Sequence, residues 1–438
     1  MATVTPDTLT ASTGRKLADP QLLKRRYAAE RRYQAYGIFA IGLGFLFLVI
    51  LFSSIISNGW SAFLQSKMTL DVYLDPAELR PDGKTDEGTL RRGNYTKLAR
   101  EALYKQLGFA ERPDRRTRRQ IHDLLSRGVD VQIRDKVLAD PSLIGQTIKV
   151  DLLAHGDVDA LLKGSISRAT PSERRQVNDQ QVAWIDKLVA DGVLEKKFNW
   201  GLFTQGASSQ PETSGLLVAL IGSSFMMLTV ALVAVPLGVA AAAYLEEFAP
   251  RNWITDVIEV NINNLAAVPS IGFGLLGLSV FISIFGLPRS ASLVGGLVLT
   301  LMTLPTIIIA TRAAIRAVPP SIREAALGVG ASKMQTLFHH TLPLALPGIL
   351  TGTIIGLLQA LGETAPLLMI GMVAFVVDAP TTPLEPATAL PVQIYMWATS
   401  AERGFVERTA GATIVLLLFL FVMNAAAVIL RRRFERKW

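Results

Sequence analysis

Cysteine is absent from this 438-residue sequence, and histidine occurs only four times. Without cysteine, the chain has no disulfide, no thiolate metal site and no cysteine nucleophile. The four histidines show no recognised ligand spacing such as HExxH, so we predict no metal site. They are His122, His155, His339 and His340.

Charge is also scarce, because only 18% of the residues are charged while 50% are hydrophobic. Residues 57–213 hold 24 of the 44 basic residues and 22 of the 36 acidic residues. This uneven distribution is unusual for a soluble chain of this length and argues against a single soluble globule. It indicates one polar domain set between strongly apolar stretches.

The formal net charge of +8 raises the alternative of nucleic-acid binding, particularly for the arginine-rich run at 112–120. The excess charge, however, lies in the tails: residues 1–35 carry seven basic and three acidic residues, and 431–438 carry five and one. Basic tails beside apolar runs are typical of the cytoplasmic side of a membrane. We therefore predict no nucleic-acid partner and interpret 112–120 as a solvated helix face.

Six apolar stretches are long enough to cross a lipid bilayer, which takes about 20 residues when a helix satisfies every backbone amide. They cover residues 36–56, 213–245, 260–288, 290–311, 344–377 and 409–430. Six crossings put both termini on one side, and the basic tails 1–35 and 431–438 assign that side to the cytoplasm. The first stretch is too long and too late in the chain for a cleaved signal peptide.

This topology makes residues 57–213 an inserted extracytoplasmic (periplasmic) domain and residues 214–430 a core of five helices. Segments 94–109 and 172–194 have the periodicity of amphipathic helices, and 146–154 resembles a short strand. We therefore predict an α+β fold for the insertion. Nothing in its sequence specifies a ligand, and we expect a structural or docking role.

Residues 312–343, between the fourth and fifth stretches, are too polar for a membrane span and contain two predicted helix starts. Each start has the serine and the acid or amide, three residues apart, of a capping box. These pairs are Ser321 with Glu324 and Ser332 with Gln335. Gly328 and Gly330 lie between them, so two short helices joined by a glycine turn are expected.

The two short helices are expected to form a cytoplasmic docking knob. The first would present the small side chains of Ala325 and Ala326 to a partner. The second would present an apolar stripe made of Met334, Leu337 and Phe338.

Six residues of this loop match the pattern EAA-x3-G-x9-I-x-LP of ABC importer permeases in type and spacing. They are Glu324, Ala325, Ala326, Gly330, Leu342 and Pro343. The loop resembles the EAA loop of that family, with His340 in place of the usual aliphatic residue. The resemblance implies that the loop sits in a groove of a separate ATP-hydrolysing subunit and couples its closure to the membrane helices.

The sequence has neither GxxxxGK[ST] nor another phosphate-cradling glycine loop. We therefore expect a chain without catalytic residues that binds no cofactor itself, the ATP being used by the partner ATPase.

Three further stretches resemble the PstA family of phosphate permeases: AAVPSIGFGLLGLSVF, LGETAPLLMIGMVAF and LPVQIYMWATSAERGF. The resemblance covers residues 214–438. It implies an all-α integral membrane protein of the cell inner membrane, with the six transmembrane helices of the type I ABC importer permease fold. It also implies three partners: a PstC-like second permease, a PstB-like ATP-binding subunit dimer and a PstS-like periplasmic phosphate-binding protein.

Glu363 is the only ionisable side chain in the fifth stretch and costs about 3 kcal/mol to insert at a bilayer centre. A carboxylate facing the path would repel phosphate, so we do not expect a direct ligand. Two roles remain open: pairing with an arginine of the partner permease, or helix packing at Gly362. By resemblance, Gln359 occupies a place where phosphate permeases commonly have arginine, so we expect the principal phosphate contacts to come from the partner. We assign Gln359, Glu363 and Thr364 to the translocation path.

Two alternatives are kept. The spacing of the coupling loop does not depend on the substrate, so another oxyanion such as molybdate or sulfate is possible. A membrane receptor with an external sensing domain belongs to a different class, and six spans without a cytoplasmic output domain argue against it.

Overall fold

The computed structural model describes residues 20–80 and 86–434. The outer parts of the two predicted basic tails, 1–19 and 435–438, lie outside the described residues. The chain divides into two compact units, residues 1–57 and 58–438.

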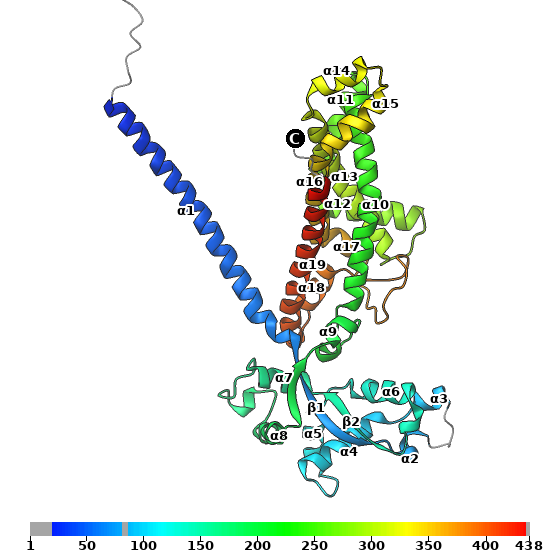
Figure 1. The fold of residues 1–438 in the computed structure, drawn as a ribbon. Coiled ribbons are helices and arrows are strands. Elements are labelled where there is room, and N and C mark those ends of the chain that lie inside the picture. Colours follow the sequence, from blue (N-terminus) through cyan, green and yellow to red (C-terminus); the bar gives the residue numbers. More distant parts are fainter. Residues whose placement is uncertain (1–19, 81–85, 435–438) are drawn as a thin grey trace, which may run out of the picture. The chain divides into compact units, whose positions relative to one another are not determined.

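The first unit is described by one helix, α1 (Pro20–Gly59), which contains the first predicted span (Figure 1). From Tyr36 to Ile56 apolar side chains lie on every face of the helix, as expected for a segment surrounded by lipid.

The polar part of the second unit contains a three-stranded antiparallel sheet with strand order β2-β1-β3 (Figure 1). The strands are β1 (Leu64–Tyr73), β2 (Thr147–Leu153) and β3 (Leu194–Phe198). The central strand pairs Leu70 with Val150 on one side and Met68 with Leu194 on the other. These four side chains are buried and anchor the core of this part.

Short helices surround the sheet. They are α2 (Pro76–Leu79), α3 (Glu87–Leu90), α4 (Tyr95–Leu107), α5 (Arg115–His122), α6 (Val129–Ala139), α7 (Gly156–Lys163), α8 (Asp179–Ala190) and α9 (Gly201–Thr204), with 3-10 turns at Trp60–Phe63, Pro141–Leu143, Ser172–Arg174 and Pro211–Thr213. The predicted helix over 94–109 is present as α4, capped by Asn94 and ended by Gly108 at φ +90°. The predicted helix over 172–194 is shorter, because Asn178 and Gln181 form a capping box that starts α8 at Asp179.

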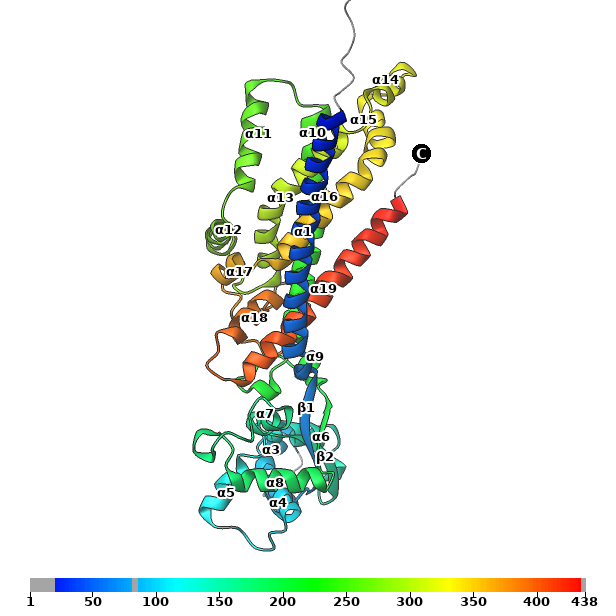
Figure 2. The same ribbon diagram turned by 90° about the vertical axis from the view of Figure 1, so that its left-hand side faces the viewer.

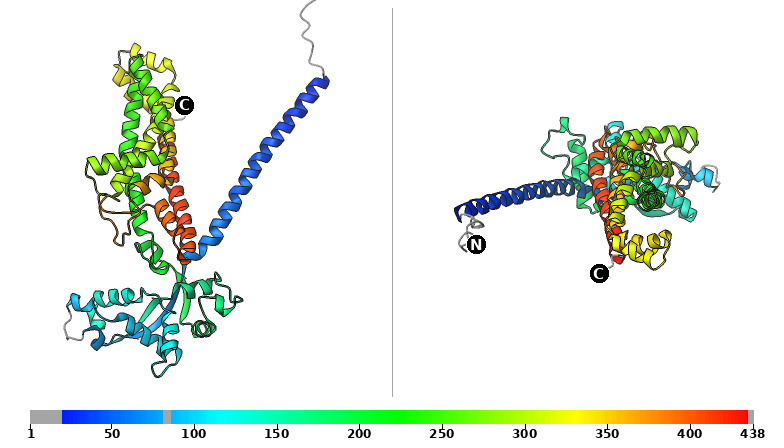
Figure 3. Two further views of the ribbon diagram at one scale, coloured as in Figure 1. Left: turned by 180° about the vertical axis from the view of Figure 1, so that it is seen from behind. Right: turned by 90° about the horizontal axis from the view of Figure 1, so that it is seen from above.

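The apolar part of the second unit is helical. Its elements are α10 (Leu217–Glu247), α11 (Trp253–Ala266), α12 (Ser270–Gly277), a π-helix (Leu278–Ile284), α13 (Ser292–Arg316), α14 (Pro320–Gly328), α15 (Lys333–Thr336), a second π-helix (Leu337–Thr341), α16 (Leu342–Gly362), α17 (Ala365–Met369), α18 (Leu390–Ala398) and α19 (Gly404–Phe434). Helix α13 packs against both α10 and α16. Figures 2 and 3 show these helices from further sides.

Glycine allows these helices to approach closely. A Cβ atom at Gly296 of α13 would lie 2.5 Å from the Cβ of Thr229 on α10. A Cβ atom at Gly352 of α16 would lie 2.2 Å from the Cβ of Ala310 on α13. Small residues at such crossings are typical of helices that associate in lipid, where close packing replaces the hydrophobic effect.

Within the described residues, five helical segments are long and apolar enough to cross a membrane. A sixth crossing is reached only if α11 and the helix over 270–284 form one span, and these two are bent by 103°. The expectation of one continuous helix over 260–288 is therefore wrong. Pro269 lies at the break, where it has no N–H to donate and disfavours a helical conformation at Val268.

The fifth predicted stretch, 344–377, also differs from the structure. The helical segment starts at Lys333 and ends at Gly362, and residues 370–389 contain no helix. Because residues 365–377 are again apolar, composition alone could not locate this end.

Candidate functional site: the coupling loop and the end of α16

The first helix of the loop, α14, starts two residues earlier than the sequence pattern predicts. Pro320 is its first residue and Pro319 its N-cap, without a side-chain cap. The predicted capping box of Ser321 with Glu324 is therefore wrong, because proline at the first helical position shifts the start.

The second predicted capping box is confirmed and starts α15. The backbone N–H of Gln335 donates to Oγ of Ser332 at 3.2 Å, and the N–H of Ser332 donates to Oε1 of Gln335 at 2.9 Å. Two otherwise unpaired backbone donors at the start of this short helix are thereby satisfied.

The turn between the two helices depends on Gly330, whose φ is +90°. Its N–H donates to the carbonyl of Leu327 at 3.0 Å, and the N–H of Ala331 donates to the carbonyl of Ala326 at 3.1 Å. A Cβ atom at Gly330 would meet nothing within 4 Å, so glycine is required by the backbone conformation and not by space.

The exposed face of the loop combines one acid with apolar side chains. Glu324 and Ala325 are exposed, whereas Ala326 is only 6% exposed. The expectation that Ala326 faces a partner is therefore wrong. We call the exposed set the docking face; it comprises Glu324, Ala325, Leu327, Val329, Met334 and Phe338.

The expected apolar stripe, which runs from α15 into the π-helix Leu337–Thr341, contains both exposed and buried side chains. Met334 and Phe338 are exposed, but Leu337 is buried against Ile315 and Ala345. Leu342 and Pro343, which complete the EAA pattern, are half-buried at the start of α16. The loop thus has its own apolar anchor and leads directly into α16.

Arg323 ties α14 to two long helices. Its Nη2 donates to the carbonyl of Ile315 on α13 at 2.6 Å. Its Nε lies 2.9 Å from Oε1 of Glu247 on α10, an ion pair that is not aligned as a hydrogen bond. Both side chains are about four-fifths buried, so solvent screens this pair only in part.

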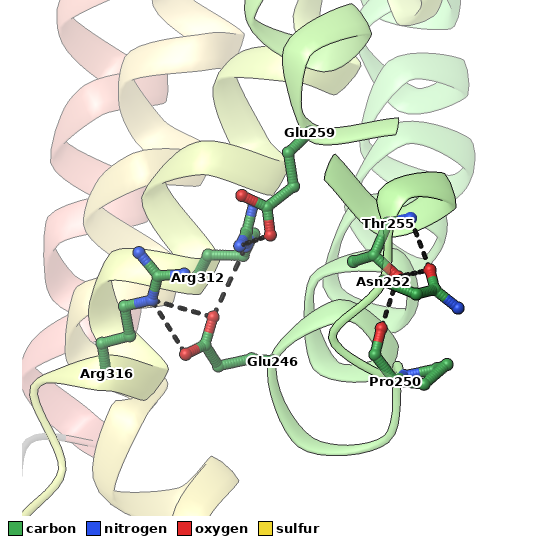
Figure 4. Close-up of polar contacts among 7 residues, drawn as sticks. All are labelled: Glu246, Pro250, Asn252, Thr255, Glu259, Arg312 and Arg316. Carbon is green, nitrogen blue, oxygen red and sulfur yellow. Dashed lines mark hydrogen bonds and ion pairs between the residues drawn. The ribbon is translucent and has the colours of Figure 1, made fainter. Parts of the chain in front are cut away.

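A second ion-pair cluster joins α10, α11 and α13 close to this attachment (Figure 4). Arg312 lies between Glu246, at 3.5 Å, and Glu259. Arg316 pairs with Glu246 at 2.8 Å. Arg312 is therefore not a free cation for the path, because two carboxylates already neutralise it.

The link from α10 to α11 is ordered by its own polar contacts (Figure 4). Oδ1 of Asn252 accepts from the backbone N–H of Thr255 at 3.0 Å, and the Thr255 hydroxyl donates to the carbonyl of Pro250 at 2.7 Å. These contacts start α11 and so position Glu259 opposite Arg312. The sequence signal for the cluster was the pair of acids, Glu246 and Glu247, at the end of the second apolar run.

The three residues assigned to the path lie where α16 ends. Helix α16 stops at Gly362, Glu363 has extended backbone, and Thr364 precedes the short α17. Gln359 is exposed, while Glu363 and Thr364 are half-buried. Within the described chain these three side chains make no hydrogen bond or ion pair with one another or with other residues.

The helix is broken between Gly362, the last residue of α16, and Ala365, the first residue of α17. A Cβ atom at Gly362 would meet nothing within 4 Å, so no close helix packing in the described chain depends on this glycine. Of the two roles kept open for this segment, packing within this chain is therefore not supported.

Two family models match the sequence. The one described as "Binding-protein-dependent transport system inner membrane component" matches residues 234–438. The one described as "Domain of unknown function (DUF3333)" matches residues 20–172.

Curated relatives match the second half of the chain. The probable ABC transporter permease protein YqgI of Bacillus subtilis (strain 168) is 31% identical over 253 residues, which are 55% of this chain and 85% of that protein. The phosphate transport system permease protein PstA 1 of Mycobacterium tuberculosis (strain CDC 1551 / Oshkosh) is 31% identical over 232 residues, 53% of this chain and 75% of that protein.

A solved structure of the MetNI methionine ABC transporter in an inward-facing conformation aligns with a TM-score of 0.41 at 17% identity, covering 50% of this chain and 98% of that chain. The matches to YqgI and PstA 1 cover most of the length of both relatives. The chain therefore belongs to the family of inner membrane components of binding-protein-dependent transport systems, as a PstA-type ABC importer permease.

Proposed function

We propose that this chain is a permease subunit of an ATP-driven importer for inorganic phosphate. It lines the translocation path together with a second, PstC-like permease. A PstB-like dimer of ATP-binding subunits supplies the energy, and a PstS-like binding protein delivers phosphate from the periplasm. The similarity to phosphate transport permeases of known name supports this substrate. The chain itself binds neither a cofactor nor a metal.

One structural observation supports the coupling role most directly: an exposed docking face is attached rigidly to the long helices behind it. Arg323 connects α14 to α10 and α13, and Leu337 anchors α15 beside Ile315. A displacement of the loop by a closing ATPase pair would therefore move these helices together, because packed elements transmit a shift instead of absorbing it. Glu324, Ala325, Gly330, Leu342 and Pro343 keep their proposed role in this coupling, with Ala326 as a buried support.

The proposed topology places the loop and both termini in the cytoplasm and residues 57–213 outside, with six crossings when the bent pair counts as one. The basic tails of the sequence support this orientation. A bent segment at membrane depth is tolerated where it is covered by protein or lines a water-filled path. The break at Pro269 is thus compatible with a position in the path.

The break after Gly362 supports a path assignment for Gln359, Glu363 and Thr364, since interrupted helices expose backbone groups that can meet a polar solute. We propose that Glu363 pairs with a cation of the second permease and that this subunit contributes the principal phosphate contacts. An unpaired carboxylate beside phosphate would repel it, whereas a paired one would hold the cation in place.

Uptake of labelled phosphate by cells lacking this gene tests the proposal. The intact gene should restore uptake, and a Glu324→Ala variant should insert normally but restore less than a tenth of it. Ser321→Ala is the matched control, because Ser321 is exposed on the same helix and caps nothing. If the gene restores uptake of labelled molybdate or sulfate but not of phosphate, the substrate assignment is wrong.

A further inference from the structure

A polar cavity of about 250 Å³ lies in the part of the chain between α4 and α7. Its walls come from α4, from α5, from the turn that follows α5 and from the start of α7. Its lining residues include three arginines, two histidines and a serine: Arg100, Arg119, Arg127, His122, His155 and Ser126. We call this cavity the arginine pocket.

The pocket is held open by backbone pairing, which does not depend on its charged side chains. The turn after α5 pairs with the end of β2: the N–H of Ser126 donates to the carbonyl of Leu153 at 3.0 Å. The N–H of His155 donates to the carbonyl of Leu124 at 2.9 Å. The hydroxyl of Tyr104 on α4 contacts Nε2 of His122, which joins α4 to α5.

The arginines of the pocket are without an acidic partner in the described chain. Arg100, Arg119 and Arg127 form no ion pair there, and Asp123 is the only acid in the pocket wall. Some arginines in the same part of the chain do pair with an acid, as Arg168 does with Asp186 at 2.7 Å. Three guanidinium groups around one cavity repel one another unless an anion lies between them.

The positive potential also acts on a neighbouring titratable group. The pKa of His122 lies below its ordinary value mainly because the ring is partly buried, and further because Arg100 and Arg118 disfavour a second positive charge. The imidazole is therefore neutral at pH 7. It can donate or accept a hydrogen bond in the pocket wall without adding a charge.

One wall of the pocket is hydrogen-bonded to the chain that leads to the membrane helices. Oγ of Ser126 donates to Oε1 of Glu212 at 2.7 Å, and Glu212 is only 6% exposed. The main-chain carbonyl of Glu212 accepts from Gln65 and, at 3.4 Å, from Nη2 of Arg408 in the first turns of α19. Arg408 is itself 6% exposed.

The second wall reaches the same helix. His155 caps α7, and Lys163 at the end of α7 lies 2.6 Å from Asp159 and 2.7 Å from Glu407 of α19. The Lys163 side chain is 5% exposed. Two buried polar connections, through Glu212 and through Lys163, thus run from the pocket to the start of α19.

We propose that the arginine pocket binds a free tetrahedral oxyanion of the phosphate class, and that its occupancy is transmitted to α19 through Glu212 and Lys163. The arginine fork matches two oxygens of such an anion at once. The cavity exceeds the volume of several waters, each about 30 Å³ in the liquid, so a hydrated oxyanion fits. The choice of phosphate as the ligand rests on the proposed function, while the presence of an anion site does not.

Titration calorimetry of the full chain in maltoside micelles tests binding, with inorganic phosphate as the probe and no other oxyanion in the buffer. The micelles contain no phosphate headgroup, so any heat comes from free phosphate. We expect saturable binding of one phosphate per chain, at least tenfold weaker in Arg100→Gln/Arg127→Gln. Arg174→Gln/Lys196→Gln removes the same charge from exposed positions outside the pocket and should bind like the original protein.

The single variant Arg119→Gln guards against a folding defect, since Arg119 is exposed on α5. It should weaken binding at least threefold and leave the unfolding curve unchanged. Equal affinity in the pocket variants and the control, or no saturable binding by the original protein, would overturn the proposal.

Hydrogen exchange on the same sample tests the transmission. Phosphate should slow exchange in residues 96–129 and also in the first turns of α19, and Lys163→Met, which changes no residue of the pocket wall and breaks the connection to Glu407, should reduce the second effect while retaining the first. Protection that stays within the polar part of the original protein would refute transmission to α19.

The two proposals can fail separately. If Glu324→Ala loses phosphate uptake but the pocket binds no oxyanion, the proposed import function stands and the proposed pocket site is refuted. If the cells take up molybdate alone but oxyanion binding depends on Arg100 and Arg127, the proposed phosphate import is refuted and the pocket site stands.

Discussion

Two groups of arginines in the second unit differ in their partners. Around α14, Arg312, Arg316 and Arg323 each have a carboxylate partner on another helix. In the arginine pocket, Arg100 and Arg127 have no such partner in the described chain. Paired arginines fix helices to one another, whereas unpaired arginines around a cavity leave their hydrogen-bonding capacity to a ligand. Arginine thus has a mechanical role around α14 and a recognition role in the arginine pocket.

Lys163 of α7, a buried cation that pairs with Glu407 near the start of α19, provides the strongest test of the mechanical role of ion pairs. Lys163→Met should destabilise the chain by about 3 kcal/mol, because it leaves the carboxylates of Asp159 and Glu407 partly buried without their cation. Chemical unfolding in micelles measures the effect. The control is Lys196→Met at an exposed position, and equal stabilities of the two variants would contradict a structural role for the Lys163 pairs.

The pair of Arg323 with Glu247, behind the coupling loop, should give the next largest loss of stability. Arg323→Gln should cost about 2 kcal/mol, since Glu247 loses a partner in a largely dehydrated place. The ratio of phosphate transported to ATP hydrolysed should fall with it. Arg432→Gln changes an exposed arginine of α19 and should leave both quantities unaltered. A normal ratio in Arg323→Gln would show that this attachment does not transmit the movement.

The glycine turn of the loop allows a sharper comparison between two neighbouring positions. Gly330→Ala should cost about 1 kcal/mol, because an L-residue is strained at φ +90°. Gly328→Ala should cost nothing, since its φ is negative and a Cβ atom there meets no other atom. Hydrogen exchange over residues 320–336 measures both, and equal exchange rates would exclude the conformational explanation.

The smallest effect is expected in the pocket. Arg100→Gln should change the free energy of unfolding by less than about 0.5 kcal/mol, or raise it slightly, because no ion pair is lost and repulsion falls. A loss comparable to that of Arg323→Gln, measured by the same unfolding assay, would show that Arg100 has a structural role instead.

The sequence predicted those features that depend on local periodicity and spacing. Helix α4, strand β2 and the capping box of Ser332 with Gln335 were recognised because their residues lie close together in the chain. The break at Pro269 was missed because both flanking segments are equally apolar. The start of α14 was misjudged because the effect of Pro320 outweighs the serine pattern.

The features that carry the proposals depend on contacts between distant segments. The partner of Arg312 on α10 lies 66 residues away in the chain, and that of Ser126 lies 86 residues away. Charge counting placed these residues in the correct polar or apolar part of the sequence. It could not show which arginines are paired, because pairing depends on how α4, α5 and α13 pack against other elements.

The central claim, that this permease couples ATP hydrolysis to phosphate import through the docking face, has one direct measurement. Proteoliposomes containing the complete importer would be assayed for labelled phosphate taken up per ATP hydrolysed, with Ser321→Ala and Glu324→Ala compared with the original protein. We predict an unchanged ratio for Ser321→Ala and at least a tenfold lower ratio for Glu324→Ala. Phosphate uptake by Glu324→Ala at the original ratio would contradict the account.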